Sequence, residues 1–248
     1  MKINGYNGYT ISYEEHIPLG AKAIIIAMHG FAGDKSSSCI DRVQEMSFAE
    51  GIGLVRFDWP AHGESETTGD NLTVQNCLSD LNAVVNHVKE ICPNARLIAF
   101  ATSFGGYLTL LYNYYHNKVF DKMILRSPAL KMYEVMSGSI LSGELKDKLN
   151  EKGYIDFGYE RIIKITSKFV NQLKENDLVK LYGDADLENV TIIHGTEDDI
   201  VPISDSIEFA KIHNCFMCSI KGADHRYKKA GELDQVISFV KMFLREQI

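Results

Sequence analysis

Residues 97–106 read Leu-Ile-Ala-Phe-Ala-Thr-Ser-Phe-Gly-Gly, and this stretch decides the fold. Its apolar first half predicts a buried strand, and residues 106–115 continue as an apolar helical stretch. Between them, Ser103 stands in the pattern small-x-Ser-x-Gly, where larger residues at 101, 105 and 106 would clash as the chain reverses. The pattern predicts a sharp strand-to-helix turn that pushes the serine hydroxyl out at the positive end of a helix.

Two later segments carry an acid and a histidine in similar positions. The apolar run 190–193 is followed by His194, Gly195 and, three residues further on, Asp198. A second apolar run, 216–220, leads into a loop that holds His225. The order Ser, Asp, His is the order of the α/β-hydrolase fold, whereas other serine-hydrolase folds use different orders.

These three residues predict nucleophilic catalysis. His225 would take the proton of the Ser103 hydroxyl and return it to the leaving group, and Asp198 would hold the imidazole in the required tautomer. Three other acids compete with Asp198 for this role, namely Asp199, Glu197 and Asp224. Asp198 is preferred because it is third after the Gly195 turn and precedes the Val-Pro pair at 201–202.

An oxyanion hole needs two N–H donors aimed at the developing charge. One should be the backbone N–H of Phe104, directly after the serine. For the other we choose Phe31, because Gly30 and Gly33 allow the backbone of its loop to approach a substrate closely. The alternative is that residues 28–33 form an ordinary turn at the end of a strand.

Other polar residues near these strands are interpreted as structural. His29 and His194 are expected to be buried and to pair with the backbone, and His62 is expected to be structural rather than catalytic. Residues 58–65 follow another strand and are expected to line one wall of the site. Substrate contacts are predicted for four aromatic residues: Trp59, Tyr133, Phe157 and Tyr159.

The chain has 248 residues, which suits one large α/β domain with a modest insertion. Strand-like and helical stretches alternate over residues 1–129 and 188–248, which predicts a mostly parallel central sheet with helices on both faces. Residues 130–187 show no clear buried strand and are expected to form a small lid insertion over the carboxyl ends of the strands.

The net charge of −7 argues against a surface for nucleic acid. The first 16 residues lack the apolar core of a signal peptide, and no apolar run is long enough to span a membrane. The five cysteines include a C-x-x-C at 215–218, a spacing also used for redox or metal sites, but buried thiols in a reducing compartment are the expectation. We therefore expect a cytoplasmic protein, and a homodimer is left open.

Together these motifs resemble the α/β-hydrolase superfamily over nearly the whole chain. Within it, the chain is similar to small bacterial cinnamoyl (feruloyl) esterases and to their monoglyceride-lipase and serine-aminopeptidase-like relatives. The resemblance implies nucleophile Ser103, acid Asp198, base His225 and oxyanion donors Phe31 and Phe104, with no metal or cofactor. The chain departs from the usual pattern of these families in having Ala-Thr before the serine, where they often have Gly-His or Gly-Asp.

The leading hypothesis is a serine ester hydrolase acting on small aromatic (cinnamoyl or feruloyl) or short-to-medium acyl esters. A peptidase of the proline-iminopeptidase type is the alternative, since the insertion supplies the acids Glu134, Glu144 and Asp156 that could hold a substrate amine. A non-catalytic binding protein on the same scaffold is the third hypothesis.

Overall fold

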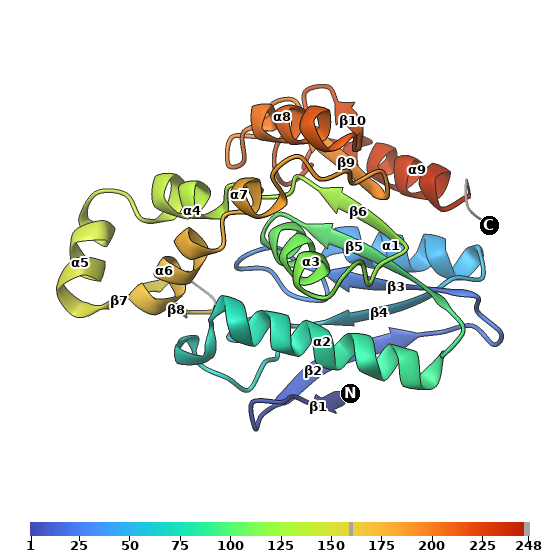
Figure 1. Ribbon diagram of the computed structural model, residues 1–248, viewed down its shortest axis with the longest axis horizontal. Helices are drawn as coiled ribbons and strands as arrows, with labels where there is room; N and C mark the ends of the chain where they lie inside the picture. Colours follow the sequence, from blue (N-terminus) through green and yellow to red (C-terminus); the bar gives the residue numbers. More distant parts are fainter. Residues whose placement is uncertain (159–160, 246–248) are drawn as a thin grey trace.

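The computed structural model describes residues 1–158 and 161–245, which are built around an eight-stranded sheet (Figure 1). The strand order is β1-β2-β4-β3-β5-β6-β9-β10, with β1 and β2 antiparallel to their neighbours and all other pairs parallel. The predicted α/β class with a mostly parallel sheet is confirmed. The strands are β1 (Lys2–Asn4), β2 (Thr10–His16), β3 (Ala23–Met28), β4 (Gly53–Phe57), β5 (Arg96–Thr102), β6 (Lys122–Arg126), β9 (Val190–Gly195) and β10 (Phe216–Ile220).

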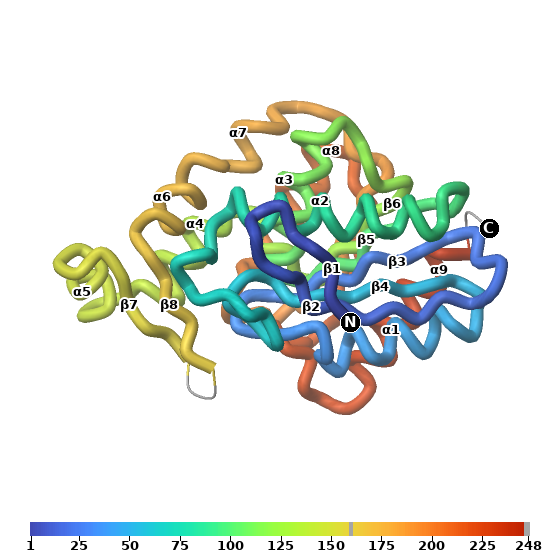
Figure 2. The backbone as a smooth tube through the Cα atoms, turned by 90° about the horizontal axis from the view of Figure 1, so that it is seen from below, coloured from blue at the N-terminus to red at the C-terminus, as the bar shows by residue number. Residues whose placement is uncertain are grey.

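Helices cover both faces of this sheet, as Figure 2 shows. One face packs against α1 (Ser38–Ala49) and α9 (Glu232–Arg245). The other packs against α2 (Val74–Ile91), α3 (Phe104–Tyr115) and α8 (Ile203–His213). Every residue of β3 is buried because strands covered on both faces expose neither set of side chains.

Helix α2 begins at Val74, directly after Thr73. The hydroxyl oxygen of Thr73 accepts a hydrogen bond from the Asn76 N–H at 3.0 Å, which caps the first turn. One turn further on, the buried carboxyl of Asp80 faces the N-terminal hairpin and accepts from the Tyr9 hydroxyl at 3.1 and 3.2 Å. Burial raises the pKa of Asp80 to about 7, although the bond from Tyr9 acts in the opposite direction.

We expect Asp80→Asn to stabilise the protein above neutral pH. Between pH 3.8 and about 7 the folded state holds a proton that the unfolded state releases, so rising pH costs the wild type stability. Asn cannot ionise and still accepts from Tyr9. The free energy of unfolding at pH 8 should therefore rise by up to about 4 kcal/mol, at roughly 1.4 kcal/mol for each pH unit.

Chemical unfolding of both proteins at pH 4 and pH 8 checks this prediction. At pH 4, where Asp80 is protonated in the folded wild type, the free energy of unfolding of the variant should be close to that of the wild type. An equal difference at both pH values would contradict it.

The segment between β6 and β9 lies at the carboxyl ends of the strands, at the left of Figure 1. The sequence shows no clear buried strand here, but the structure contains a short antiparallel pair, β7 with β8. Each strand has only four residues, too few for alternating burial to be recognised in the sequence. The segment comprises α4 (Met132–Val135), a π-helical turn (Met136–Ile140), α5 (Glu144–Lys152), β7 (Tyr154–Phe157), β8 (Ile163–Thr166), α6 (Ser167–Glu175) and α7 (Leu178–Tyr182).

This insertion packs closely against the segment that precedes α2. Gly69, in a 3-10 turn (Gly69–Asn71), has no room for a side chain, since a Cβ would lie 2.1 Å from the Lys164 carbonyl oxygen. The Lys164 ammonium pairs with Asp70 at 2.7 Å, and the Gln172 side chain accepts from the Val74 N–H at 2.9 Å. The insertion is thereby held over one edge of the site.

None of the helices in the described residues is both long and apolar enough to cross a membrane. The five cysteines are free thiols; Cys218 is buried in β10, and Cys215 directly precedes that strand.

Candidate active site

Ser103 occupies the junction between β5 and α3 in a strained conformation, with φ 51° and ψ −113°. Non-glycine residues rarely adopt a positive φ, and such strain persists only where the surroundings impose it. Here the Ser103 N–H donates to the Arg126 carbonyl at 3.0 Å, and its own carbonyl accepts from Tyr107 and Ala129. The turn is thus fixed on one side by β6 and on the other by the first turn of α3.

The small residues around Ser103 allow two other loops to approach it. A Cβ on Gly105 would lie 2.6 Å from the His29 carbonyl oxygen, and one on Gly106 would lie 2.9 Å from the Pro128 Cβ. On the facing loop, a Cβ on Gly30 would lie 3.3 Å from the Ser103 Cβ. The small-x-Ser-x-Gly pattern therefore lets the loop after β3 pack directly against the serine.

This packing brings the two expected oxyanion donors together. Phe104 opens α3, so its N–H is one of the groups that a helix leaves without an internal acceptor. Neither the Phe31 N–H nor the Phe104 N–H donates a hydrogen bond within the described residues. The Phe31 and Phe104 rings also meet edge to face at 5.8 Å.

Asp198 and His225 form a close pair. The Asp198 Oδ2 lies 2.7 Å from the His225 Nδ1, while its Oδ1 accepts the N–H groups of Ile200 (3.0 Å) and Val201 (2.8 Å). Burial acts to raise the pKa of Asp198, but hydrogen bonds from His194 and His225 hold it well below its usual range. Asp198 is therefore ionised at neutral pH and is suited to orient His225.

The competing acids lie elsewhere. Glu197 is exposed and pairs with the Lys229 ammonium at 3.3 Å. Asp224 accepts a hydrogen bond from the backbone of Arg226, and Asp199 is exposed.

Arg126 links the serine to the histidine. Its carbonyl accepts from Ser103, its Nε donates to the Thr102 hydroxyl at 3.4 Å, and its Nη1 donates to the His225 carbonyl at 3.3 Å. No hydrogen bond from the Ser103 hydroxyl to His225 or to any other described residue is present. Such catalytic bonds are often long in ligand-free enzymes and shorten when substrate binds.

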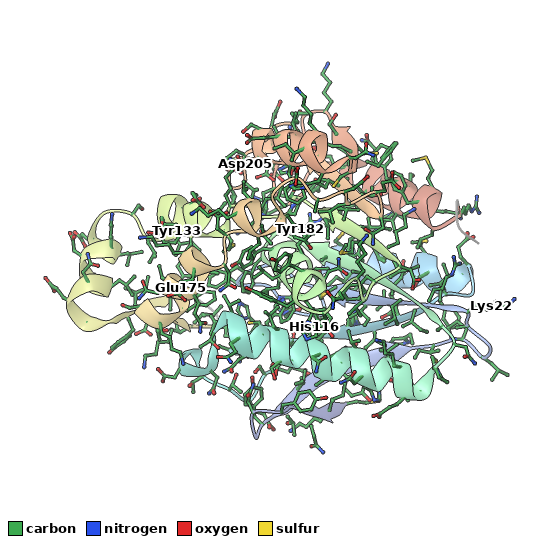
Figure 3. The ribbon with its side chains drawn as sticks, viewed as in Figure 1. Lys22, His116, Tyr133, Glu175, Tyr182 and Asp205 are labelled. Carbon is green, nitrogen blue, oxygen red and sulfur yellow. The ribbon has the colours of Figure 1, made fainter. Side chains whose placement is uncertain are left out.

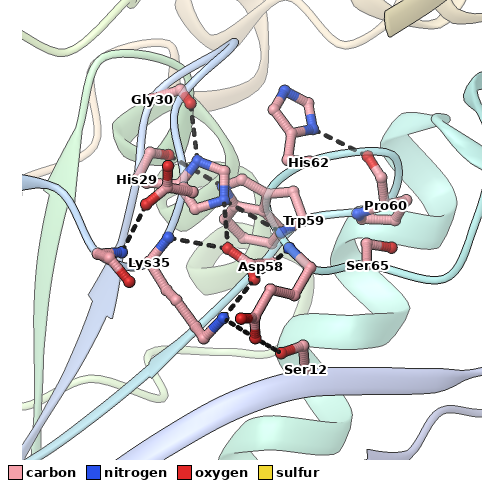
Figure 4. Close-up of polar contacts among 12 residues, drawn as sticks. Ser12, His29, Gly30, Lys35, Asp58, Trp59, Pro60, His62 and Ser65 are labelled. Carbon is pink, nitrogen blue, oxygen red and sulfur yellow. Dashed lines mark hydrogen bonds and ion pairs between the residues drawn. The ribbon is translucent and has the colours of Figure 1, made fainter. Parts of the chain in front are cut away.

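A buried polar network holds the loop of Phe31 in place (Figure 4). Asp58, at the end of β4, accepts from the Lys35 N–H and ammonium, both at 2.8 Å, and from the Glu64 N–H at 2.9 Å. Burial disfavours the charged Lys35, yet hydrogen bonds to Asp58 and Glu64 raise its pKa. The network ties residues 29–35 to residues 58–64.

His29 belongs to the same support. Its Nδ1 donates to the Gly30 carbonyl at 2.8 Å, and its Nε2 accepts the Trp59 N–H at 3.2 Å. The Trp59 indole N–H donates back to the His29 carbonyl at 3.0 Å. Because burial lowers the pKa of His29, the ring is neutral, in agreement with a structural role.

His62 is also buried, and its ring is turned away from the Asp58 network in Figure 4. Its Nδ1 donates to the Pro60 carbonyl at 2.9 Å, and burial together with nearby His29 lowers its pKa to about 3. The neutral ring packs edge to face against Phe31 at 5.3 Å. It supports the Phe31 loop, as expected of a structural histidine.

A cleft of about 1110 Å³ lies beside these residues. It separates the insertion from the core loops, and its walls include Arg226, which follows His225, and Ala32, which follows Phe31. The Arg161 guanidinium closes one side by donating to the Ala61 carbonyl at 2.8 Å and to the Ser65 carbonyl at 2.9 Å. The lining comprises residues 32–36, 62–64 and 156–158, with Leu145, Arg161, Ile163 and Arg226.

The four predicted substrate contacts have different positions. Phe157 lines the cleft, and its ring lies 6.0 Å from that of Phe31. Trp59 is fully buried behind His29 and does not reach the cleft, so its prediction as a contact is corrected to a supporting position. Tyr133, on α4 in Figure 3, lines a separate pocket of about 130 Å³, and Tyr159 falls outside the described residues.

Sequence reasoning missed three residues at this site. It expected His194 to pair with the backbone alone, whereas His194 also contacts Asp198 at 3.2 Å. It gave no role to Arg126 or Arg161, whose contacts join segments far apart in the chain. The position of His194 four residues before Asp198 was the one available signal, but the spacing alone does not show that they touch.

Comparisons with known proteins identify the family of this chain. The profile of the serine aminopeptidase family S33 matches residues 20–179, more than half of the chain. No curated protein sequence matches significantly.

Several solved structures share the fold. Est1E from Butyrivibrio proteoclasticus, with ferulic acid bound, is 25% identical with a TM-score of 0.84, covering 100% of this chain and 98% of its own. Alpha/beta hydrolase domain-containing protein 10 from mouse is 18% identical (TM-score 0.77, covering 100% and 99%). The monoacylglycerol lipase of Paleococcus ferrophilus is 18% identical (TM-score 0.69, covering 94% and 98%). The chain is thus an α/β-hydrolase and belongs to the serine aminopeptidase S33 family.

Proposed function

We propose that this protein is a serine carboxylic-ester hydrolase that acts through an acyl-enzyme on Ser103. The observation that carries the proposal is the convergence of three features at one edge of the sheet. These are a strained serine at a helix N-terminus, the Phe31 and Phe104 N–H groups, which have no acceptor among the described residues, and a largely buried Asp198–His225 pair. The likeness to Est1E, whose structure contains ferulic acid, supports an ester with an aromatic acyl group.

In the proposed mechanism, His225 Nε2 takes the hydroxyl proton as Ser103 Oγ bonds to the ester carbonyl carbon. The carbonyl oxygen becomes negative and is stabilised by the N–H groups of Phe31 and Phe104. When the bond to the alkoxy oxygen breaks, His225 gives its proton to the leaving alcohol. Water, activated by the same imidazole, then releases the carboxylic acid and restores Ser103. These steps need no metal or organic cofactor.

Hydrolysis of a panel of esters, from acetyl to lauroyl and including methyl ferulate, tests the proposal, with Ser103→Ala as the reference. Ser103-dependent turnover of any ester supports it, and preference for ferulate would favour the aromatic acyl group. Absence of ester turnover, with no labelling of Ser103 by a fluorophosphonate, would favour a binding protein instead.

Phe157→Ala is expected to lower kcat/KM for methyl ferulate by about 10-fold or more, because loss of apolar contact to a substrate costs roughly 1–3 kcal/mol. Phe157 lines the cleft beside Phe31, whereas Tyr133 lines the separate pocket and provides a matched aromatic control. Rates for an acetyl ester, which has no aromatic ring to contact Phe157, should stay nearly unchanged in both variants. An equal loss in Tyr133→Ala would contradict the assignment of the acyl pocket.

A peptidase activity is the second candidate, because the family is named for aminopeptidases and Asp156 places a carboxylate in the cleft. Of the other acids considered for binding an amine, Glu134 lines the separate pocket and Glu144 is exposed beside Lys148. Turnover of aminoacyl-naphthylamides that falls in Asp156→Asn would favour this activity over ester hydrolysis.

A further inference from the structure

Asp198 is in contact with two imidazoles. Its Oδ2 lies 2.7 Å from the His225 Nδ1 and 3.2 Å from the His194 Nε2. The side chains of Asp198 and His194 are fully buried, so water does not compete for this oxygen. The proposed mechanism requires only the first of these contacts and leaves the second unexplained.

The partners of His194 determine its tautomer. Its Nε2 faces only acceptors, the Asp198 carboxylate and the Val201 carbonyl at 3.0 Å, so this nitrogen carries a hydrogen. Its Nδ1 lies 2.8 Å from the Ser206 hydroxyl on α8, which can donate to it. Ser206 and the Val201 carbonyl therefore hold His194 with its Nε2–H beside the Asp198 carboxylate, whether the ring is neutral or charged.

We propose that His194, held by Ser206, is a positioning residue that fixes Asp198 and draws part of its negative charge away from His225. The proposal rests on the function proposed above. A carboxylate that shares its charge with a second donor attracts an imidazolium less strongly. Without this second donor, the charge on Asp198 would attract the His225 imidazolium more strongly.

Other polar and charged groups also surround His225. Arg126, on β6, donates to the His225 carbonyl and lies 4.8 Å from the Tyr227 ring. Burial raises the pKa of Tyr227 to about 12, so its hydroxyl stays neutral. Three acids on the adjoining segments have partners of their own: Asp205 with Lys131, Glu197 with Lys229, and Asp224 with the Arg226 backbone. Asp199 and Arg226 are exposed to solvent, which screens their charges.

Two variants at one position separate the N–H donor from the packing. His194→Phe fills the space without a donor, and His194→Gln retains an N–H near the position of Nε2. The imidazole of His225 would be titrated by NMR in each protein, with its signal assigned from His225→Gln. In His194→Phe the titration midpoint should move to higher pH by about 0.5–1, and in His194→Gln it should stay near the wild-type value. The rise of kcat/KM for an ester at acidic pH should shift along the pH axis in the same direction and by a similar amount.

An unchanged midpoint in folded His194→Phe would overturn the proposal, as would equal shifts in both variants, which would indicate packing alone. If His194→Phe fails to fold, Ser206→Ala replaces it; a smaller upward shift supports the proposal and no shift overturns it. The NMR titration needs no substrate. A wild type that hydrolyses no ester would therefore refute the proposed function while this inference is still decided by the midpoints.

Discussion

Replacing Ser103 by alanine should lower kcat for ester hydrolysis by up to about 10⁶-fold, the loss found when the nucleophile of a serine triad is removed. Alanine keeps a Cβ at the strained turn, so the contacts of the backbone with Arg126 and Ala129 should persist. The oxyanion donors and the cleft remain, so substrate should still bind. Most of the loss should therefore appear in kcat rather than in KM.

Steady-state kinetics on one ester, combined with fluorophosphonate labelling and mass spectrometry, checks this result. The wild type should be labelled at Ser103 and the variant not at all, while thermal unfolding of both should be similar. Retained activity in a variant that resists labelling would show that another group performs the hydrolysis.

Asp198→Asn should lower kcat by about 10⁴-fold at neutral pH, because the base would hold its proton on the wrong nitrogen. The structure explains why the amide cannot adapt. The Ile200 and Val201 N–H groups require an oxygen at the Oδ1 position, so the new NH₂ must face His225. The His225 Nδ1 then has to accept a hydrogen bond, and the ring carries its hydrogen on Nε2, where Ser103 needs a lone pair.

Asp199→Asn is the matched control, since it removes the neighbouring carboxylate from an exposed position. Its kcat/KM should equal that of the wild type across the pH range. A large loss in Asp199→Asn with a mild one in Asp198→Asn would reverse the assignment of the acid.

Local patterns in the sequence predicted the fold because they report on short-range physics. The continuous apolar run of β5 indicated a buried strand, and the alternation of strand-like and helical stretches indicated a mostly parallel sheet. The small residues at 105 and 106 indicated the turn at Ser103, and the structure shows the atoms that a larger side chain would strike. Signals of this kind depend on residues within a few positions of one another.

The short strands β7 and β8 gave no such signal. Their four residues each leave room for only two buried positions per strand, and a helix or loop would show the same pattern. The position of Tyr133, one of the contacts predicted in the insertion, could not be predicted for a related reason. An aromatic side chain such as Tyr133 packs into whichever pocket the neighbouring helices form, and the sequence does not show which pocket that is.

The sequence by itself determined the α/β class, the position of the strained serine and the order of the three candidate triad residues, because each follows from periodicity or from steric limits at a turn. Tertiary structure alone decided that Trp59 supports the Phe31 loop from the core and that Lys35 pairs with Asp58. It also decided that the His194 ring contacts Asp198 through one nitrogen and the Ser206 hydroxyl through the other. These contacts depend on how separate loops meet at the ends of parallel strands, and that meeting is set by the packing of the whole sheet and its helices.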